Sequence, residues 1–194
     1  IKRDLEKPVK IIIDYGIFPS DMKDGFAELS KNKINLCSQI SVFCSEILKN
    51  NGFEVFYTSD KTNTSSPGLF SRIKKANKAK GDLIVSINIG FDENKDENIF
   101  RAYYFKGIKS FSRNGKKLAD LICAEFEKSI PDIFSESSGA SFAVLKDTNM
   151  TSVYIEAGNM NNKNMAALLA DRDFQQKTGL CIADALIKYI REDI

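Results

Sequence analysis

The 194-residue chain contains no histidine and no tryptophan, and it has only four prolines and four cysteines. The lack of histidine excludes every catalytic mechanism with an imidazole base, including Ser-His-Asp and Cys-His systems, and every metal site that needs imidazole ligands. No apolar stretch approaches the ~18 residues that cross a bilayer, so we expect no transmembrane segment within these residues. The net charge is only +2, which argues against a dedicated nucleic-acid-binding protein and predicts no nucleic-acid partner.

The four cysteines, Cys37, Cys44, Cys123 and Cys181, include no CxxC pair. Each lies within a stretch of periodic apolar residues, where a free cysteine usually acts as a small buried hydrophobic side chain. Cys37 and Cys44 are seven residues apart, which on a helix separates them by about 10 Å, too far for a disulfide. We therefore expect four structural thiols.

Strand and helix patterns alternate along the chain after a charged, non-periodic tail at residues 1–7. Strands are predicted at 9–13, 53–57, 83–87, 99–105, 142–145 and 152–155. Helices are predicted at 32–51, 67–80, 110–129, 163–170 and 173–190, and a long loop at 17–31. This order predicts one α/β domain over residues 8–194, a three-layer sandwich whose mostly parallel central sheet of about six strands has helices on both faces. In such a sheet the functional crevice lies beyond the carboxyl ends of the strands, which places segments 14–17, 88–90 and 156–159 at one edge.

These strand ends carry Asp14-Tyr15-Gly16-Ile17, Ser86-Ile87-Asn88 and Glu156-Ala157-Gly158-Asn159-Met160-Asn161-Asn162. Between them lie Arg72 with Ala76 and Asn77, then Tyr103-Tyr104-Phe105 and Val144-Leu145-Lys146-Asp147-Thr148. In order and spacing these motifs resemble the zinc-dependent N-acetylmuramoyl-L-alanine amidases, whose strand ends read Asp-Pro-Gly-His, Ser-Ile-His and Glu-x-Gly-Phe-x-x-Asn. The resemblance runs from residue 9 to residue 189. It implies the amidase fold, which resembles that of the zinc exopeptidases, and an activity that cuts peptide stems from peptidoglycan glycan strands.

The resemblance also implies a zinc ion held by His, Glu and His, with a separate Glu that moves the proton. Here Ile17 and Asn88 stand at the two His positions, and Lys33 or one of the two residues before it stands at the Glu position. A hydrocarbon, a carboxamide and a lysine are not zinc ligands. We therefore expect no metal and no other cofactor, with Glu156 kept at the position of the proton-moving Glu as a vestigial general base.

The predicted function is an amidase-like cell-wall domain that has lost its zinc site, an inactive pseudo-amidase that binds peptidoglycan fragments or an envelope protein partner. Asn88, Lys146 and Asn159 are the candidates for the binding groove. By resemblance the setting is the bacterial cell envelope outside the cytoplasmic membrane, with the protein secreted or anchored through a segment outside these residues.

Two other functions stay open. One is an active amidase with a rebuilt metal site and Glu156 as general base. An all-oxygen group drawn from Glu28, Asp14, Asp92 and Glu93 would suit Mg²⁺ or Ca²⁺ better than Zn²⁺. The other is an interaction module whose binding surfaces lie elsewhere.

Structural roles are also open for several of these residues. Glu156 is equally compatible with a carboxylate hydrogen-bonded near a strand end, and desolvation there without zinc would raise its pKa. Asn88 is expected to cap the turn after its strand in preference to contacting a ligand. Arg72 and Asn77 are expected to hold their helix against a loop, and residues 159–162 to form a turn before a helix.

Overall fold

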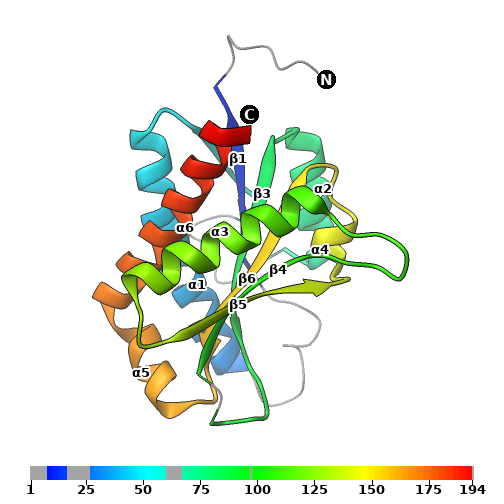
Figure 1. Cartoon of the computed structure of the whole chain (residues 1–194). Coiled ribbons are helices and arrows are strands. Elements are labelled where there is room, and N and C mark those ends of the chain that lie inside the picture. The colour runs from blue at the N-terminus through cyan, green and yellow to red at the C-terminus, as the bar shows by residue number, and fades with distance from the viewer. Residues whose placement is uncertain (1–7, 17–26, 60–66, 97, 194) are drawn as a thin grey trace.

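A computed structural model describes residues 8–16, 27–59, 67–96 and 98–193. Its strands are β1 (Lys10–Asp14), β2 (Glu54–Tyr57), β3 (Leu83–Gly90), β4 (Ile99–Phe105), β5 (Phe134–Ala140) and β6 (Thr151–Asn159). They form one sheet in the order β2-β1-β3-β6-β4-β5 (Figure 1). Its helices are α1 (Ala27–Asn50), α2 (Leu69–Ala79), α3 (Arg113–Ser129), α4 (Ala143–Lys146), α5 (Lys163–Ala170) and α6 (Arg172–Asp193). Neighbouring strands run parallel except β4 and β6, which are antiparallel, so the predicted mostly parallel α/β sheet is confirmed.

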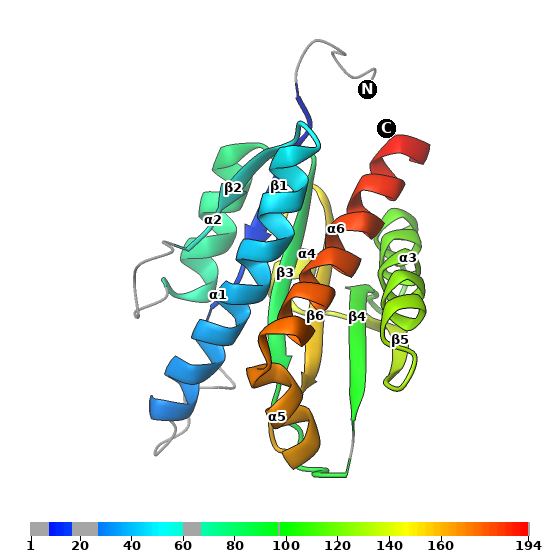
Figure 2. The same cartoon turned by 90° about the vertical axis from the view of Figure 1, so that its left-hand side faces the viewer.

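Each face of the sheet buries its own hydrophobic cluster. Side chains alternate along a strand, so Ile11 and Ile13 of β1 enter the larger cluster and Ile12 enters the smaller one. Figure 2 looks onto α1, α6 and α3, which cover the face of the larger cluster. The smaller cluster lies under α2, which contributes Ala76, and under α4, which contributes Leu145. Because both faces are covered, β1 and β3 are buried along almost their whole length, and most of their residues are apolar. Within the described residues no helix has the length and apolarity to span a membrane.

The prediction for the β5 end of the sheet was wrong in two respects. Residues 142–145 were predicted as a strand, but Ala143–Lys146 is the short helix α4, with Val144 and Leu145 packed into the smaller cluster. A four-residue apolar run has the same composition in either state, so periodicity could not separate them. The strand that was missed is β5, at the outer edge of the sheet. Its sequence FSESSGA is polar because most of its side chains stay partly or fully exposed.

Two helix boundaries also differ from the prediction. Helix α1 begins at Ala27, so the loop predicted for 17–31 is wrong for its last five residues, and 17–26 lie outside the described residues. Helix α2 runs from Leu69 to Ala79, so it begins two residues later than the predicted 67–80, and its C-cap Lys80 takes the left-handed conformation (φ 53°). The next residue, Gly81, allows close packing on β1, since a Cβ there would meet the Ile12 side chain at 2.4 Å.

Candidate functional site

The carboxyl ends of β1, β3 and β6 are neighbours in the sheet. Asp14 lies beside Ser86, and Asn88 lies beside Glu156. After a register shift, Gly90 pairs with Asn159. The predicted juxtaposition of the three strand ends is therefore confirmed for the described residues, while Ile17 lies outside them.

Asp14 is fully engaged in a buried network below this edge. Its Oδ1 accepts hydrogen bonds from the Thr58 hydroxyl and from Arg72 Nε (2.9 Å), and its Oδ2 accepts one from Ser86 Oγ (2.7 Å). Arg72 Nη1 also donates to the Pro67 carbonyl oxygen (2.7 Å), just before α2. Arg72 thus has the structural role expected of it, since its ion pair with Asp14 fixes α2 to the end of β1.

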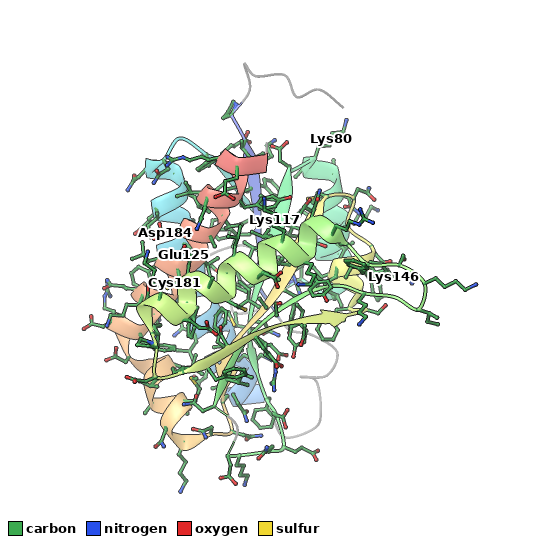
Figure 3. All side chains as sticks on the ribbon, viewed as in Figure 1. Lys80, Lys117, Glu125, Lys146, Cys181 and Asp184 are labelled. Atoms are coloured by element: carbon green, nitrogen blue, oxygen red, sulfur yellow. The ribbon has the colours of Figure 1, made fainter. Side chains whose placement is uncertain are left out.

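Asn77 and Lys146 lie on the α2 and α4 side of the sheet. Asn77 Nδ2 donates to the Asp147 carbonyl oxygen and its Oδ1 accepts from the Asn149 backbone N–H, both at 2.9 Å, so it holds α2 against the loop after α4 as expected. Lys146, labelled in Figure 3, is exposed at the end of α4 and does not line the pocket beside Glu156. Its role in a groove stays a prediction.

Glu156 projects from β6 at the centre of this edge. Its Oε2 accepts a hydrogen bond from the Tyr103 hydroxyl (3.0 Å). Burial raises the pKa of the Glu156 carboxyl, as expected, and the nearby Asp92 charge adds to this. The Tyr103 hydrogen bond and the positive charges of Lys33 and Arg101 act in the opposite direction. Burial and the Glu156 charge also raise the pKa of Tyr103, so the phenol stays protonated as the donor at neutral pH.

Asn88 is buried inside β3, and both ends of its carboxamide are engaged. Its Nδ2 donates to the Tyr154 hydroxyl, and the Cys37 thiol donates weakly to its Oδ1 at 3.9 Å. The expectation that Asn88 caps a turn is wrong, because β3 continues to Gly90. The strand runs on past Ile87 because a further strand, β6, pairs with it along its full length.

Lys33 lies on the side of α1 that packs toward this edge. It is only 7% exposed, whereas Lys31 and Asn32 are exposed. It precedes Cys37 by four residues, or about one helical turn, so the two side chains share a helix face. Because Cys37 contacts Asn88, that face packs against β3. Of the three candidates for the Glu position, Lys33 is thus the one at the site.

A pocket of about 200 Å³ opens beside Glu156. It is lined by Gly90, Phe91, Asp92, Ile99, Arg101, Tyr103, Glu156, Gly158 and Asn159. Glycine at position 90 helps to keep the pocket open, since a Cβ there would lie 3.6 Å from the Glu156 carboxyl carbon and 3.3 Å from the Gly158 carbonyl oxygen. The pocket therefore presents positive and negative charges, and hydrogen-bond donors and acceptors, to a small polar part of a ligand.

Asn159 forms one wall of the pocket, but its side chain is committed to structure. Its Nδ2 donates to the Asn94 carbonyl oxygen (2.9 Å), and its Oδ1 accepts from the Asp92 backbone N–H (3.0 Å). Residues 159–162 form the predicted turn into α5, with Asn162 as the N-cap. Asn159 thus holds the loop that carries Asp92.

Metal-ligating side chains do not gather at this edge within the described part of the chain. No three His, Cys, Asp or Glu side chains there are close enough together to hold a metal ion. Asp14 is consumed by its buried network. Glu28 lies in α1, but its side chain is outside the described residues.

The sequence interpretation missed the polar role of Tyr103. Its ring packs against two other rings, with 5.2 Å to Phe142 and 5.9 Å to Tyr154 between centroids. Its hydroxyl nevertheless reaches Glu156, because the antiparallel pairing of β4 and β6 places Arg101 opposite Glu156 and Tyr103 opposite Tyr154. Alternation along Arg101-Ala-Tyr103 gave a hint that the two side chains share a face, but no local pattern indicated which strand lies beside β4.

The fold and the place of the pocket define an α/β domain whose site lies at the carboxyl ends of parallel strands. The sequence model of the N-acetylmuramoyl-L-alanine amidases matches residues 25–188. The chain therefore belongs to the N-acetylmuramoyl-L-alanine amidase family, whose members act on the peptidoglycan of the bacterial cell wall.

Individual relatives agree with this assignment. The chain is 26% identical over 131 residues to the N-acetylmuramoyl-L-alanine amidase LytC of Bacillus subtilis (strain 168), a match that covers 68% of this chain but only 26% of LytC. The solved structure of N-acetylmuramoyl-L-alanine amidase AmiC2 of Nostoc punctiforme is similar with a TM-score of 0.77 and 23% identity, covering 94% of this chain and 97% of that one. The CwlD amidase of Clostridioides difficile, solved in complex with the GerS lipoprotein, has a TM-score of 0.77 and 19% identity, with 95% and 100% covered.

Proposed function

We propose that the chain is a non-hydrolytic member of its family, a domain of the bacterial cell envelope that binds peptidoglycan fragments or a protein partner without cleaving them. The observation that carries this proposal is the identity of the residues around Glu156. The side chains that face it from α1 and stand beside it on β3 are a lysine and a carboxamide, Lys33 and Asn88. Neither residue is a zinc ligand.

The residues present do not fit a catalytic zinc ion. Such a site needs three protein donors, usually imidazole, thiolate or carboxylate, and an open position for water. The chain has no histidine, and the Asn88 carboxamide is occupied by Tyr154 and Cys37. The Lys33 ammonium, buried on the same side, would repel a divalent cation. These facts support an amidase fold without the family's zinc.

Glu156 alone does not supply amide hydrolysis. Cleavage of an unactivated amide needs an activated nucleophile and a polarised carbonyl group. The raised pKa of Glu156 makes it a better proton acceptor, but no described group activates the water or polarises the carbonyl in the way a metal would. The side chains that line the pocket are nevertheless suited to binding a ligand. Tyr103 and Arg101 carry hydrogen-bond donors, and Glu156 and Asp92 carry acceptors, around a pocket of about 200 Å³.

Family membership supports peptidoglycan as the first ligand class to test, and with it a location outside the cytoplasmic membrane. A protein partner is supported by CwlD, a protein of the same fold that was solved in complex with a lipoprotein. The chain spans about a quarter of LytC (26%), so the localisation and activity of the relative are proposals when carried to this chain.

The test uses the purified chain and defined muropeptides, with LytC as the active control. We expect saturable binding by isothermal titration calorimetry, NMR shifts at residues 90–92 and 156–159, no released stem peptide by mass spectrometry, and no stoichiometric zinc in the protein. Release of stem peptides together with a bound metal would establish the rebuilt-site amidase instead. Muropeptides that bind LytC but leave this chain's signals unchanged would favour a domain whose partner docks elsewhere.

A further inference from the structure

Lys33 is an unusual residue to find buried. Lysine side chains are almost never fully enclosed unless an opposite charge lies close by. At 7% exposure, Lys33 is among the most enclosed charged residues of the described chain, together with Asp14 and Arg72, which form an ion pair with each other. The position of Lys33 therefore calls for a negative group near it.

The geometry of α1 directs Lys33 toward Glu156. Lys33 lies about one turn from Cys37 toward the N-terminus of α1, and Cys37 contacts Asn88, the β3 neighbour of Glu156. Figure 2 shows the N-terminal end of α1 at the same edge of the molecule as the arrowheads of β3 and β6. Lys33 therefore lies nearer than Cys37 to the carboxyl ends of β3 and β6, the edge at which Glu156 is located.

Four groups on the surrounding elements act on the pKa of Glu156. They are Tyr103 and Arg101 from β4, Lys33 from α1, and Asp92 from the loop after β3. Arg101 shares its charge with Glu136, since Arg101 Nε lies 2.9 Å from Glu136 Oε1. Asp92 is itself negative. Among the described residues, Lys33 is the cation of α1 whose charge acts on the Glu156 carboxylate.

We propose that Lys33 is a positioning residue that supplies, at this strand end, the positive charge that a bound zinc ion supplies in active amidases. Its ammonium compensates the Glu156 carboxylate, so the site keeps its shape without a metal ion. An ammonium group balances charge but does not bind and deprotonate water as a metal does, so the exchange preserves the groove and gives up the nucleophile. This inference rests on the proposed function and names the residue responsible for the metal-free state.

The test is a double-mutant cycle between Lys33→Met and Glu156→Gln, measured as urea unfolding at neutral pH. We expect Lys33→Met to lower the equilibrium ratio of folded to unfolded protein about tenfold more in the wild-type background than in the Glu156→Gln background. The matched control is Lys31→Met, an exposed lysine two residues away on the same helix, whose effect should be the same in both backgrounds. Lys33→Gln repeats the cycle with a polar side chain, and Lys33→Arg should behave as the wild type.

A second readout separates charge compensation from simple packing. Carbon-13 NMR of the Glu156 carboxyl should show a higher pKa in Lys33→Met than in the wild type, and an unchanged pKa in Lys31→Met and Lys33→Arg. Additive effects in the cycle, or an unchanged Glu156 pKa in Lys33→Met, would overturn the inference. Either result would leave the non-hydrolytic function intact, because that proposal fails on the release of stem peptides and not on the Lys33 variants.

Discussion

Arg72 and Asp14 form an ion pair in which each side chain is only 1% exposed, with Arg72 Nε 2.9 Å from Asp14 Oδ1. The carboxylate is further satisfied by Thr58 and Ser86, so it has hydrogen bonds from β3, from α2 and from the segment after β2. This pair joins three elements just below the edge that carries Asn88 and Glu156. Among the motif residues that resemble those of the amidases, Asp14 and Arg72 stabilise the fold and take no part in the chemistry.

Removing one partner of this pair should strongly lower the free energy of unfolding. Arg72→Met leaves the Asp14 carboxylate buried without its cation, and breaking a buried pair in this way typically costs about 3–5 kcal/mol. Lys188→Met is the control, because Lys188 lies 3.6 Å from Glu125 in a pair whose lysine is 49% exposed. That exposed pair should contribute less than about 1 kcal/mol. Urea unfolding of both variants gives the comparison, and equal losses would contradict the structural role of Arg72.

The stability of Glu156→Gln relative to that of the wild type should rise between about pH 4 and neutral pH. A carboxyl whose pKa is raised in the folded state binds more protons folded than unfolded between its two pKa values. The free energy of unfolding of the wild type therefore falls as the pH rises through that window, whereas glutamine has no proton to lose. Glutamine also keeps an oxygen that can accept the Tyr103 hydrogen bond.

The measurement is urea unfolding of the two proteins from about pH 4, near the unfolded glutamate value, to neutral pH. The stability difference in favour of Glu156→Gln should grow with pH. Tyr103→Phe sharpens the test, since it removes a hydrogen bond that lowers the pKa of Glu156 and should widen the window. A difference that shrinks with rising pH would show that the carboxylate, and not the acid, is the favoured form in the fold.

Gly158 should not accept a side chain. Its φ of +151° is strained for other residues, and a Cβ there would meet the Met165 sulfur at 2.4 Å. Gly158→Ala should therefore cost about 1–3 kcal/mol and displace α5 or the pocket wall beside Glu156. Gly68→Ala is the control, because a Cβ at that position would have nothing within 4 Å. Circular dichroism melts of the two variants check the difference, and a Gly158→Ala protein as stable as Gly68→Ala would refute it.

The central strands of the sheet could be predicted because their apolar composition is visible within each short segment. The run Ile11–Ile13 and the strand from Leu83 have to be apolar on both faces, since helices cover both sides of a parallel sheet. The edge strand β5 does not need to be apolar on both faces, and its polar sequence FSESSGA is therefore equally typical of a loop. The apolar residues of α4 satisfy a helix packed on the sheet as well as a strand within it, which is why that segment was assigned wrongly.

The candidate site was predictable in part for the same reason. That Asn88 and Glu156 lie together follows from strand ends meeting at one edge, which is a rule of topology. That Tyr103 reaches Glu156, and that Lys33 and not Lys31 faces it, depends on the antiparallel placement of β4 and the rotation of α1. Both are set by packing between segments far apart in the chain, and no local sequence pattern determines them.

The thiols provide the last prediction, since all four cysteines are buried and free in the fold, as their surroundings in the sequence indicated. Burial raises the pKa of Cys44 far above its ordinary value, raises that of Cys123 to about 11, and raises that of Cys181. Only the thiolate reacts with disulfide reagents. The folded chain at pH 8 should therefore react slowly with Ellman's reagent, whereas the urea-unfolded chain should release four equivalents at once.

The order of reaction provides a sharper check than the total. Cys123 keeps 7% exposure, whereas Cys44 is fully enclosed and its pKa is raised further, so Cys123 should react before Cys44, which should react only through unfolding. Peptide mapping after partial labelling identifies the sites, and Cys123→Ser should remove a phase that precedes the modification of Cys44. Immediate modification of all four thiols in the folded chain would mean that α1, α3 and α6 do not enclose them as the structure shows, because each of these thiols lies on one of those three helices.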